Sequence, residues 1–340
     1  MPIYLSLRVD VVSVKSVSGM LENLHKLGIK PVRRVNSRGT FNPHLSIRFG
    51  EHKFNIDSTR SRRRDIDDGC YLITHAHSDH YGKSAMLSKR AYASDKTARA
   101  LELRYGNKFM GTTFAVGDTV DIDGVAVDTY HTYHTLGSTA FSWISDNGSR
   151  VLVTGDVKNA KDLPNCDVLV TEANYGDPED PACHFEDDIM GFNNALKHNV
   201  AFGAYAFGKA QRAVEMLLAT GYDGAIGMND EIRALTSELM DIDSDKLIGI
   251  NEGATIQITT PRRLHEVKSD KKYVLTARDE YQRPTIQISD HLDSGGLLRM
   301  VKASKAEVVI VYHPEGTRAG VFAKYLNKYG IQAMSLYEIE

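Results

Sequence analysis

The sequence has little of what marks secreted or membrane-bound proteins. Among its 340 residues there are only three cysteines, Cys70, Cys166 and Cys183, and their spacing matches neither a disulfide framework nor a Cys-x-x-Cys zinc motif. No apolar run approaches the ~18 residues that a membrane span needs, and the first residues do not resemble a secretion leader. We therefore expect a cytoplasmic protein without a membrane segment.

The chain also has no large excess of charge of one sign. Its 41 basic and 44 acidic residues give a formal net charge of -3. A nucleic-acid partner would have to be held by local basic patches, since there is no overall positive field. What is present is an ordinary globular composition, 42% hydrophobic and 25% charged. A chain of this length predicts two domains, or one large domain that carries an insertion.

Short β-branched runs separated by helical patterns indicate how the chain is organised. In the first half we expect strands at residues 52–57, 71–74, 125–130, 140–144, 151–154 and 168–171, and helices at 83–89 and 96–105. From about residue 177, helices (185–198, 209–220, 231–240) alternate with strands (200–205, 225–228, 247–250), which is typical of a parallel sheet. We therefore predict an α/β fold in which residues 1–176 and 283–340 form one domain, and residues 177–282 form an inserted parallel α/β domain.

Potential metal ligands crowd the segment that follows the strand expected at 71–74. His75, His77, Asp79 and His80 lie within six residues, and imidazole and carboxylate are side chains that suit zinc. A cluster of surface histidines is the alternative, but few structural loops need this density. Because one ion cannot comfortably use all four groups, the segment predicts two ions.

Other strand ends supply further candidates. His134 lies between two expected strands, and Asp156 follows the strand at 151–154, where its carboxylate could bridge two cations ~3.5–4 Å apart. We interpret His131, in the strand pattern, as a packing or solvated residue. Asp57 could accept the outer N–H of a ligating histidine and fix its tautomer.

This pattern resembles the metallo-β-lactamase superfamily, with its Asp strand end (Asp57), its His-x-His-x-Asp-His loop, a later His134 and a bridging Asp156. The resemblance implies an αββα sandwich. It leaves the substrate open, because lactam, thioester and lactone hydrolases, oxidoreductases and nucleases share this set of residues.

Four further segments resemble, in the right order, the motifs of the β-CASP nucleases within that superfamily: Thr-Glu-Ala-Asn-Tyr-Gly-Asp (171–177), Ala-Tyr-Ala-Phe-Gly-Lys-Ala-Gln (204–211), Ser-Asp-His-Leu-Asp (289–293) and Val-Tyr-His-Pro-Glu (311–315). The inserted domain would then be the β-CASP cap. The RNA 3′-end-processing nucleases and ribonuclease J carry appended domains that we do not expect here. Lys209, Arg212 and Pro314 depart from the usual Arg, Glu and Gly, which puts substrate contacts in doubt more than chemistry.

The resemblance implies a role for each residue of the centre. One zinc ion would be held by His75, His77 and His134, and a second by Asp79, His80 and His313, with Asp156 as the bridge. His291 would act as general acid, oriented by Glu172. We expect Asp79 to act both as a metal ligand and as a catalytic residue.

Substrate contacts are expected from Lys209 at a helix start, from Ser138 near His134, and from Arg62 and Arg63 in a basic loop. A solvated lysine and a flexible basic loop are the alternatives. The resulting hypothesis is a two-zinc nuclease. RNA is favoured over DNA because His313 goes with the RNA-processing branch, whereas the DNA-repair branch usually carries Val. A DNA nuclease, a small-molecule hydrolase and a silent RNA-binding paralogue are the competing hypotheses.

Overall fold

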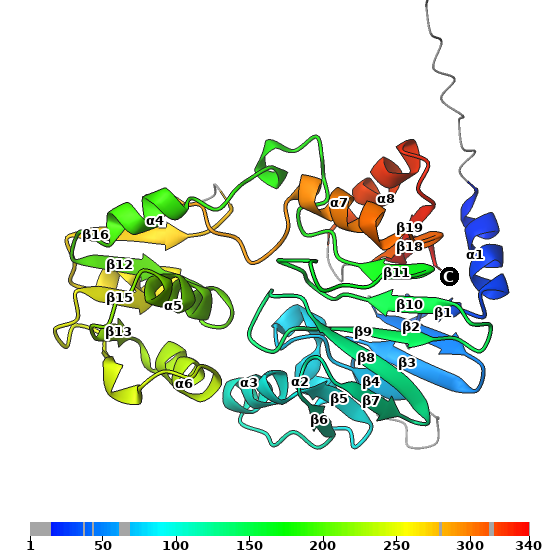
Figure 1. The fold of residues 1–340 in the computed structure, drawn as a ribbon, viewed down its shortest axis with the longest axis horizontal. Helices are drawn as coiled ribbons and strands as arrows, with labels where there is room; N and C mark the ends of the chain where they lie inside the picture. Colours follow the sequence, from blue (N-terminus) through cyan, green and yellow to red (C-terminus); the bar gives the residue numbers. More distant parts are fainter. Residues whose placement is uncertain are drawn as a thin grey trace, which may run out of the picture.

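Two β-sheets lie face to face in the computed structural model, which describes residues 15–36, 38–42, 44–60, 69–278, 281–312 and 316–339 (Figure 1). The first sheet has the order β1-β2-β3-β4-β5-β6. Its strands are β1 (Lys30–Val32), β2 (Leu45–Phe49), β3 (His52–Ile56), β4 (Cys70–Leu72), β5 (Ala91–Ser94) and β6 (Thr112–Phe114). Arg62, Arg63 and His313, which the sequence analysis assigned to the site, lie outside the described residues.

The second sheet has the order β19-β18-β11-β10-β9-β8-β7. Its strands are β7 (Thr119–Ile122), β8 (Val125–His131), β9 (Thr139–Ile144), β10 (Arg150–Val153), β11 (Val168–Thr171), β18 (Val308–Val311) and β19 (Ala333–Ser335). Alternating apolar side chains on both sheets form the shared core. At its centre the ring of Phe54 meets that of Trp143 edge-on at 5.0 Å.

Helices cover the outer face of each sheet. Apolar side chains of α2 (Gly82–Ala85) and α3 (Asp95–Tyr105) share a buried cluster with β4 and β5. In the same way α7 (Ser294–Ser304) and α8 (Arg318–Lys328) pack on β10, β11 and β18. A further helix, α1 (Val17–Lys26), adds Met20 and Leu24 to the central core. The layers therefore run helix, sheet, sheet, helix, and the predicted α/β class is confirmed.

A third sheet, entirely parallel, lies beside this sandwich with the order β14-β13-β15-β12-β16-β17 (Figure 1). Its strands are β12 (Val200–Gly203), β13 (Ile226–Met228), β14 (Leu247–Gly249), β15 (Ile256–Thr259), β16 (Lys271–Leu275) and β17 (Thr285–Ile286), and its helices are α4 (Ile189–Ala195), α5 (Lys209–Ala219) and α6 (Asp230–Leu239).

The helix expected from residue 185 begins later, because the Asp188 carboxylate accepts the Gly191 N–H at 2.7 Å and caps α4 there. The sequence analysis missed β15 and β16, although β15 pairs with both β12 and β13.

The third sheet contacts the sandwich through α6. Leu235 and Leu239 of α6 belong to the same buried cluster as Leu101 of α3, and Arg99 forms an ion pair with Glu238 at 3.0 Å. The contact holds the start of α5 close to the sandwich. Within the described part of the chain, no helix has the length and apolar character of a membrane span.

Candidate metal centre

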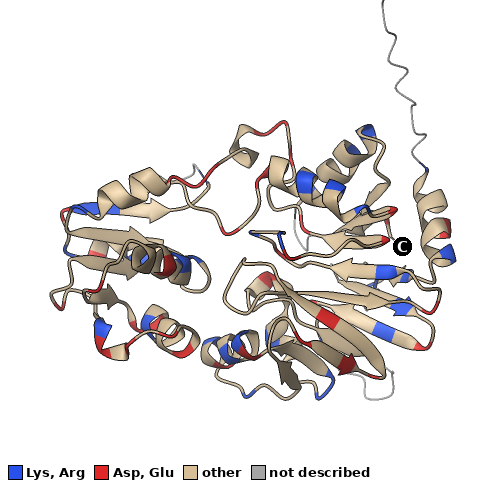
Figure 2. Ribbon diagram, in the orientation of Figure 1, with Lys and Arg blue, Asp and Glu red and all other residues tan. Residues whose placement is uncertain are grey.

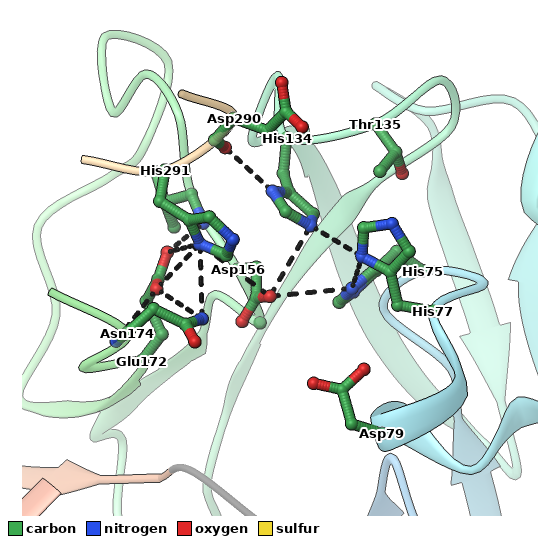
Figure 3. Close-up of polar contacts among 12 residues, drawn as sticks. His75, His77, Asp79, His134, Thr135, Asp156, Glu172, Asn174, Asp290 and His291 are labelled. Carbon is green, nitrogen blue, oxygen red and sulfur yellow. Dashed lines mark hydrogen bonds and ion pairs between the residues drawn. The ribbon is translucent and has the colours of Figure 1, made fainter. Parts of the chain in front are cut away.

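Strand ends from both sheets of the sandwich bring the predicted residues to one edge. Asp57 follows β3 and His75 follows β4, and these two strands run parallel. In the second sheet β8, β10 and β11 point in a common direction, and they are followed by His134, Asp156 and Glu172. Residues that are far apart in the chain, such as His75 and Glu172, therefore converge in the view of Figure 3.

Three imidazoles and one carboxylate offer a compact set of ligand atoms. His77 Nδ1 lies 3.1 Å from His75 Nε2 and 3.0 Å from His134 Nε2. Asp156 Oδ2 lies 3.6 Å from His75 Nε2 and 3.5 Å from His134 Nε2. Zinc–nitrogen bonds of about 2.0–2.1 Å in a tetrahedron imply ligand atoms about 3.3–3.4 Å apart. The four atoms therefore fit the coordination shell of one divalent metal ion.

Each of these imidazoles is oriented by a contact at its other nitrogen. His77 Nε2 lies 3.2 Å from the carbonyl oxygen of Phe207, and His134 Nδ1 lies 2.7 Å from that of Asp290. His75 Nδ1 lies 3.0 Å from the Thr74 hydroxyl. A carbonyl can only accept, so Nε2 of His77 and Nδ1 of His134 carry the protons. The nitrogens that face Asp156 are then free to bind a metal.

A second group of ligands lies next to the first and shares Asp156. His80 Nε2 is 3.4 Å from Asp156 Oδ1 and 4.0 Å from Asp79 Oδ2, and it hydrogen-bonds to none of the described residues. A buried nitrogen without a partner is costly, and a cation would satisfy it. The other nitrogen of His80 donates to Asp57 Oδ2 at 2.6 Å, so the imidazole is held in place. These contacts fit a second cation site.

Asp57 orients both groups. Its carboxylate accepts the Thr74 N–H at 2.8 Å and the Thr74 hydroxyl at 2.6 Å, besides the His80 contact. Through Thr74 it therefore also fixes His75. The sequence analysis assigned Asp57 this outer role but did not find Thr74, whose hydroxyl carries no signal in the sequence.

The local electrostatics prepare the first group of ligands for a cation, whereas in the second group the effect of burial on His80 is outweighed by Asp156 and Asp57, which raise its pKa. Burial lowers the pKa of His75 and His134 well below the usual imidazole value, which outweighs the opposite effect of Asp156. Burial likewise lowers the pKa of His77. Burial would by itself raise the pKa of Asp156, but the imidazoles of His80, His291 and His134 bring this pKa well below the usual range for a carboxyl group. Neutral imidazoles and an ionised carboxylate are the forms that bind metals.

His291 and Glu172 form a pair on the other side of Asp156 (Figure 3). His291 Nδ1 lies 3.0 Å from Glu172 Oε2 and 3.9 Å from Asp156 Oδ2. Burial lowers the pKa of His291, but the charge and hydrogen bond of Glu172 outweigh it and raise the pKa overall. Glu172 also accepts the Val157 N–H at 2.6 Å and the Asn174 side-chain amide at 2.9 Å. His291 therefore holds a proton more firmly than a free imidazole.

Comparison with known proteins agrees with this geometry. The sequence profile of the metallo-beta-lactamase superfamily matches residues 61–204. The chain carries a metallo-beta-lactamase superfamily domain. Members of the superfamily are generally metal-dependent hydrolases, and the cluster of His and Asp residues suggests that a divalent metal binds here.

Its architecture is also similar to the crystal structure of a protein of unknown function from Enterococcus faecalis V583. The TM-score is 0.62 at 10% sequence identity, over 91% of this chain and 97% of that chain. At this identity the likeness concerns the fold alone. No curated protein matches the chain.

A cavity of about 560 Å³ opens beside the two groups of ligands and His291. Its lining includes Asp79, Asp156 and His291 together with groups that the sequence analysis missed: two arginines, Arg104 and Arg278, and three tyrosines, Tyr81, Tyr175 and Tyr205. Arg104 comes from α3 and donates to the carbonyl of Ala76, within the histidine segment. Arg278 follows β16 of the third sheet, so both parts of the molecule contribute cations to one cavity.

Two of the expected substrate contacts have protein partners. Ser138 is 2% exposed, and its hydroxyl accepts the N–H groups of His134 and Thr135 at 3.1 and 3.2 Å. It therefore holds the His134 loop from inside, a position that does not favour contact with a substrate. Lys209 is 6% exposed and donates to the Ile288 carbonyl at 2.9 Å. Direct binding of substrate by either residue remains a prediction.

Proposed function

We propose that the protein is a two-zinc nuclease that hydrolyses phosphodiester bonds. The observation that carries this proposal is the Glu172–His291 pair, which faces the same carboxylate, Asp156, as the two ligand groups. Cleavage of a phosphodiester releases an alkoxide that needs a proton. A histidine with a raised pKa beside the metal ligands is suited to supply it.

In this proposal His75, His77 and His134 would hold one zinc ion, Asp79, His80 and His313 would hold the other, and Asp156 would be shared between the two groups of ligands. Bound zinc ions would lower the pKa of water and stabilise charge on the phosphate. His291 keeps Nδ1 on Glu172 and delivers its proton from Nε2 to the leaving oxygen. Glu172 fixes the ring through its contact with Nδ1 and stabilises the charged form, because three hydrogen bonds from Val157 and Asn174 hold the carboxylate in place.

The cavity supports a nucleic-acid substrate over a small neutral one. Arg104 and Arg278 offer positive charge for backbone phosphates, and Tyr205, which is 47% exposed, offers a ring on which a base can stack. Elsewhere basic and acidic residues are interspersed, as Figure 2 shows, so the attraction would be local. We place the inserted cap at residues 177–282, and this segment contributes Tyr205 and Arg278.

We propose RNA as the preferred polymer. This preference follows from the resemblance of His313 to the RNA-processing branch of the β-CASP nucleases. A DNA nuclease differs from this proposal in one measurable outcome, the relative rates on matched RNA and DNA.

The decisive experiment digests end-labelled single-stranded RNA and DNA of one sequence, each with a 5′-phosphate or a 5′-hydroxyl. Metal analysis of the same preparation gives the zinc content. The control is Asp156→Asn, purified identically, because loss of the carboxylate shared by both ligand groups should abolish cleavage. It also excludes a contaminating nuclease.

The proposal predicts about two zinc ions per chain and faster cleavage of RNA, absent in the Asp156 variant. Faster cleavage of DNA would reject the preference for RNA but would leave the proposed nuclease activity standing. Lactone or thioester hydrolysis without any nuclease activity would reject the proposal altogether.

A further inference from the structure

A turn of the third sheet reaches the histidines of the metal centre. This turn, residues 206–208, leads into α5, which begins at Lys209. Its Phe207 carbonyl accepts the proton of His77 Nε2 at 3.2 Å. Gly208 has a φ of +89°, and a Cβ there would lie 2.9 Å from Thr135 Cγ2 and 3.4 Å from His77 Nε2. Only glycine lets the turn approach this closely.

The residue that follows the turn, the first of α5, is a buried lysine. Lys209 Nζ donates to the Ile288 carbonyl at 2.9 Å and lies 3.4 Å from Asp290 Oδ2. Lys209 and Asp290 are 6% and 5% exposed. A buried ammonium is costly unless it is paired, so these contacts hold the turn and the segment 288–290 together.

That segment orients two histidines of the site. The carbonyl of Asp290 accepts the proton of His134 Nδ1 at 2.7 Å. The next residue, His291, is joined to Ser289 by hydrogen bonds of 3.1 and 3.2 Å between the Ser289 hydroxyl and the backbone of His291. A shift of this segment would therefore turn the ring of His134 and displace His291.

We propose that Lys209 is a positioning residue, which fixes the Ile288–Asp290 segment and thereby the imidazoles of His134 and His291. Lys209 also lines the cavity that contains His291 and Asp156, but in this proposal it acts through its contacts with Ile288 and Asp290 and not by binding the substrate. The inference rests on the proposed function only for its effect on turnover, because its effect on the metal can be measured without any substrate.

The two possible roles of Lys209 predict different kinetics. A positioning residue changes the geometry of the metal and of the proton donor, so its loss lowers kcat and leaves KM nearly unchanged. A substrate contact made equally in the ground and transition states would raise KM and leave kcat unchanged. Contacts that orient metal ligands typically contribute 10–100-fold to metal affinity or activity.

The test compares Lys209→Met, Lys209→Arg and Lys271→Met in the full chain. Lys271 is an exposed lysine of β16 in the same sheet, so its variant controls for the loss of one positive charge. Each protein is stripped of metal and titrated with Co²⁺, and the visible absorption spectrum and affinity are recorded. Steady-state cleavage of RNA by the zinc-loaded proteins gives kcat and KM.

We expect Lys209→Met to weaken Co²⁺ binding roughly 10–100-fold, to alter the spectrum and to lower kcat. Lys209→Arg should retain much of the Co²⁺ affinity, of the wild-type spectrum and of kcat. Lys271→Met should match the wild type in all three. A wild-type spectrum and affinity in Lys209→Met would overturn the inference, whatever the value of KM.

Folding can be separated from positioning. Lys209→Met leaves the buried Asp290 carboxylate without its cation, so the double variant Lys209→Met/Asp290→Asn removes this charge as well. If only the double variant folds, its Co²⁺ titration decides the question in the same way. If the wild type binds metal but cleaves no nucleic acid, the proposed function fails while the metal titration still tests Lys209.

Discussion

Replacing His291 by alanine should remove most of the turnover and leave the metal ions in place. The Nδ1 atom of His291 is taken by Glu172, and the four converging ligand atoms come from other residues. The variant should fold, because Glu172 keeps hydrogen bonds from Val157 and Asn174. A positioned general acid contributes typically 10²–10⁴-fold. We therefore expect kcat to fall by roughly 10²–10⁴, or about 2.7–5.5 kcal/mol of activation free energy.

The assay pairs metal analysis with single-turnover cleavage of labelled RNA. A second substrate carries sulfur in place of the leaving oxygen, because a thiolate leaves without a proton. This substrate should recover most of the lost rate if His291 acts as an acid. His131→Ala is the matched control, because it removes an exposed histidine of β8 and should have no effect.

The pH profile gives an independent measurement. Glu172 raises the pKa of His291 above 6.5, so the imidazole is protonated below that pKa and loses its proton as the pH rises through it. The wild-type rate should therefore decline on the alkaline side, and this decline should be absent in His291→Ala. Loss of a zinc ion from the variant would instead show that His291 is a ligand, since Asp156, Glu172 and His291 could also hold a metal. An unchanged rate would remove it from the mechanism.

Three further predictions follow from the contacts of the centre. Asp57→Asn leaves one oxygen for three N–H and O–H donors, so zinc affinity measured against a chelator should fall roughly 10–100-fold. Burial lowers the pKa of His75 and His134, so both stay neutral as the pH falls through 6.5, whereas the effect of burial on His80 is outweighed by Asp156 and Asp57, which raise its pKa. Equilibrium dialysis should therefore show the ion of His75, His77 and His134 retained below that pH and the ion of His80 lost first. Gly208→Ala combines a disfavoured φ with a contact to Thr135, and should lower the unfolding free energy by roughly 1–3 kcal/mol in urea titration. The same substitution at the open Gly320 of α8 is its control, and equal stability of the two variants would contradict the reasoning.

The spacing of the ligands could be read from the sequence because it is local. His75, His77, Asp79 and His80 lie in one short segment after a strand, and the chain itself keeps them together. Asp156 could be added because strand ends in a layered fold meet at one edge. Six strands of the sandwich, β3, β4, β8, β9, β10 and β11, were likewise visible as β-branched runs. The strands β1, β2, β5, β6 and β7 of the sandwich and β15 and β16 of the third sheet were not predicted.

The partners that orient these ligands could not be predicted in this way. The carbonyl of Phe207 accepts a proton from His77, 130 residues away, and that of Asp290 accepts one from His134, 156 residues away. Every residue except proline has both an N–H and a carbonyl. Nothing in the identity of a residue shows which carbonyl will be used. Lys209 illustrates this: as a lysine at a helix start it predicts a phosphate contact, which stays a prediction, and only folding shows that its ammonium lies against Ile288 and Asp290.

The sequence by itself therefore determined the kinds of ligand, their order along the chain and the mixed α/β class. Only the tertiary structure decided which nitrogen of each imidazole faces Asp156, which groups share the cavity with His291, and that a turn of the third sheet orients His77. The physical reason is that ligand chemistry belongs to the side chain. Tautomer, burial and pairing depend on neighbours that only folding brings within hydrogen-bonding distance.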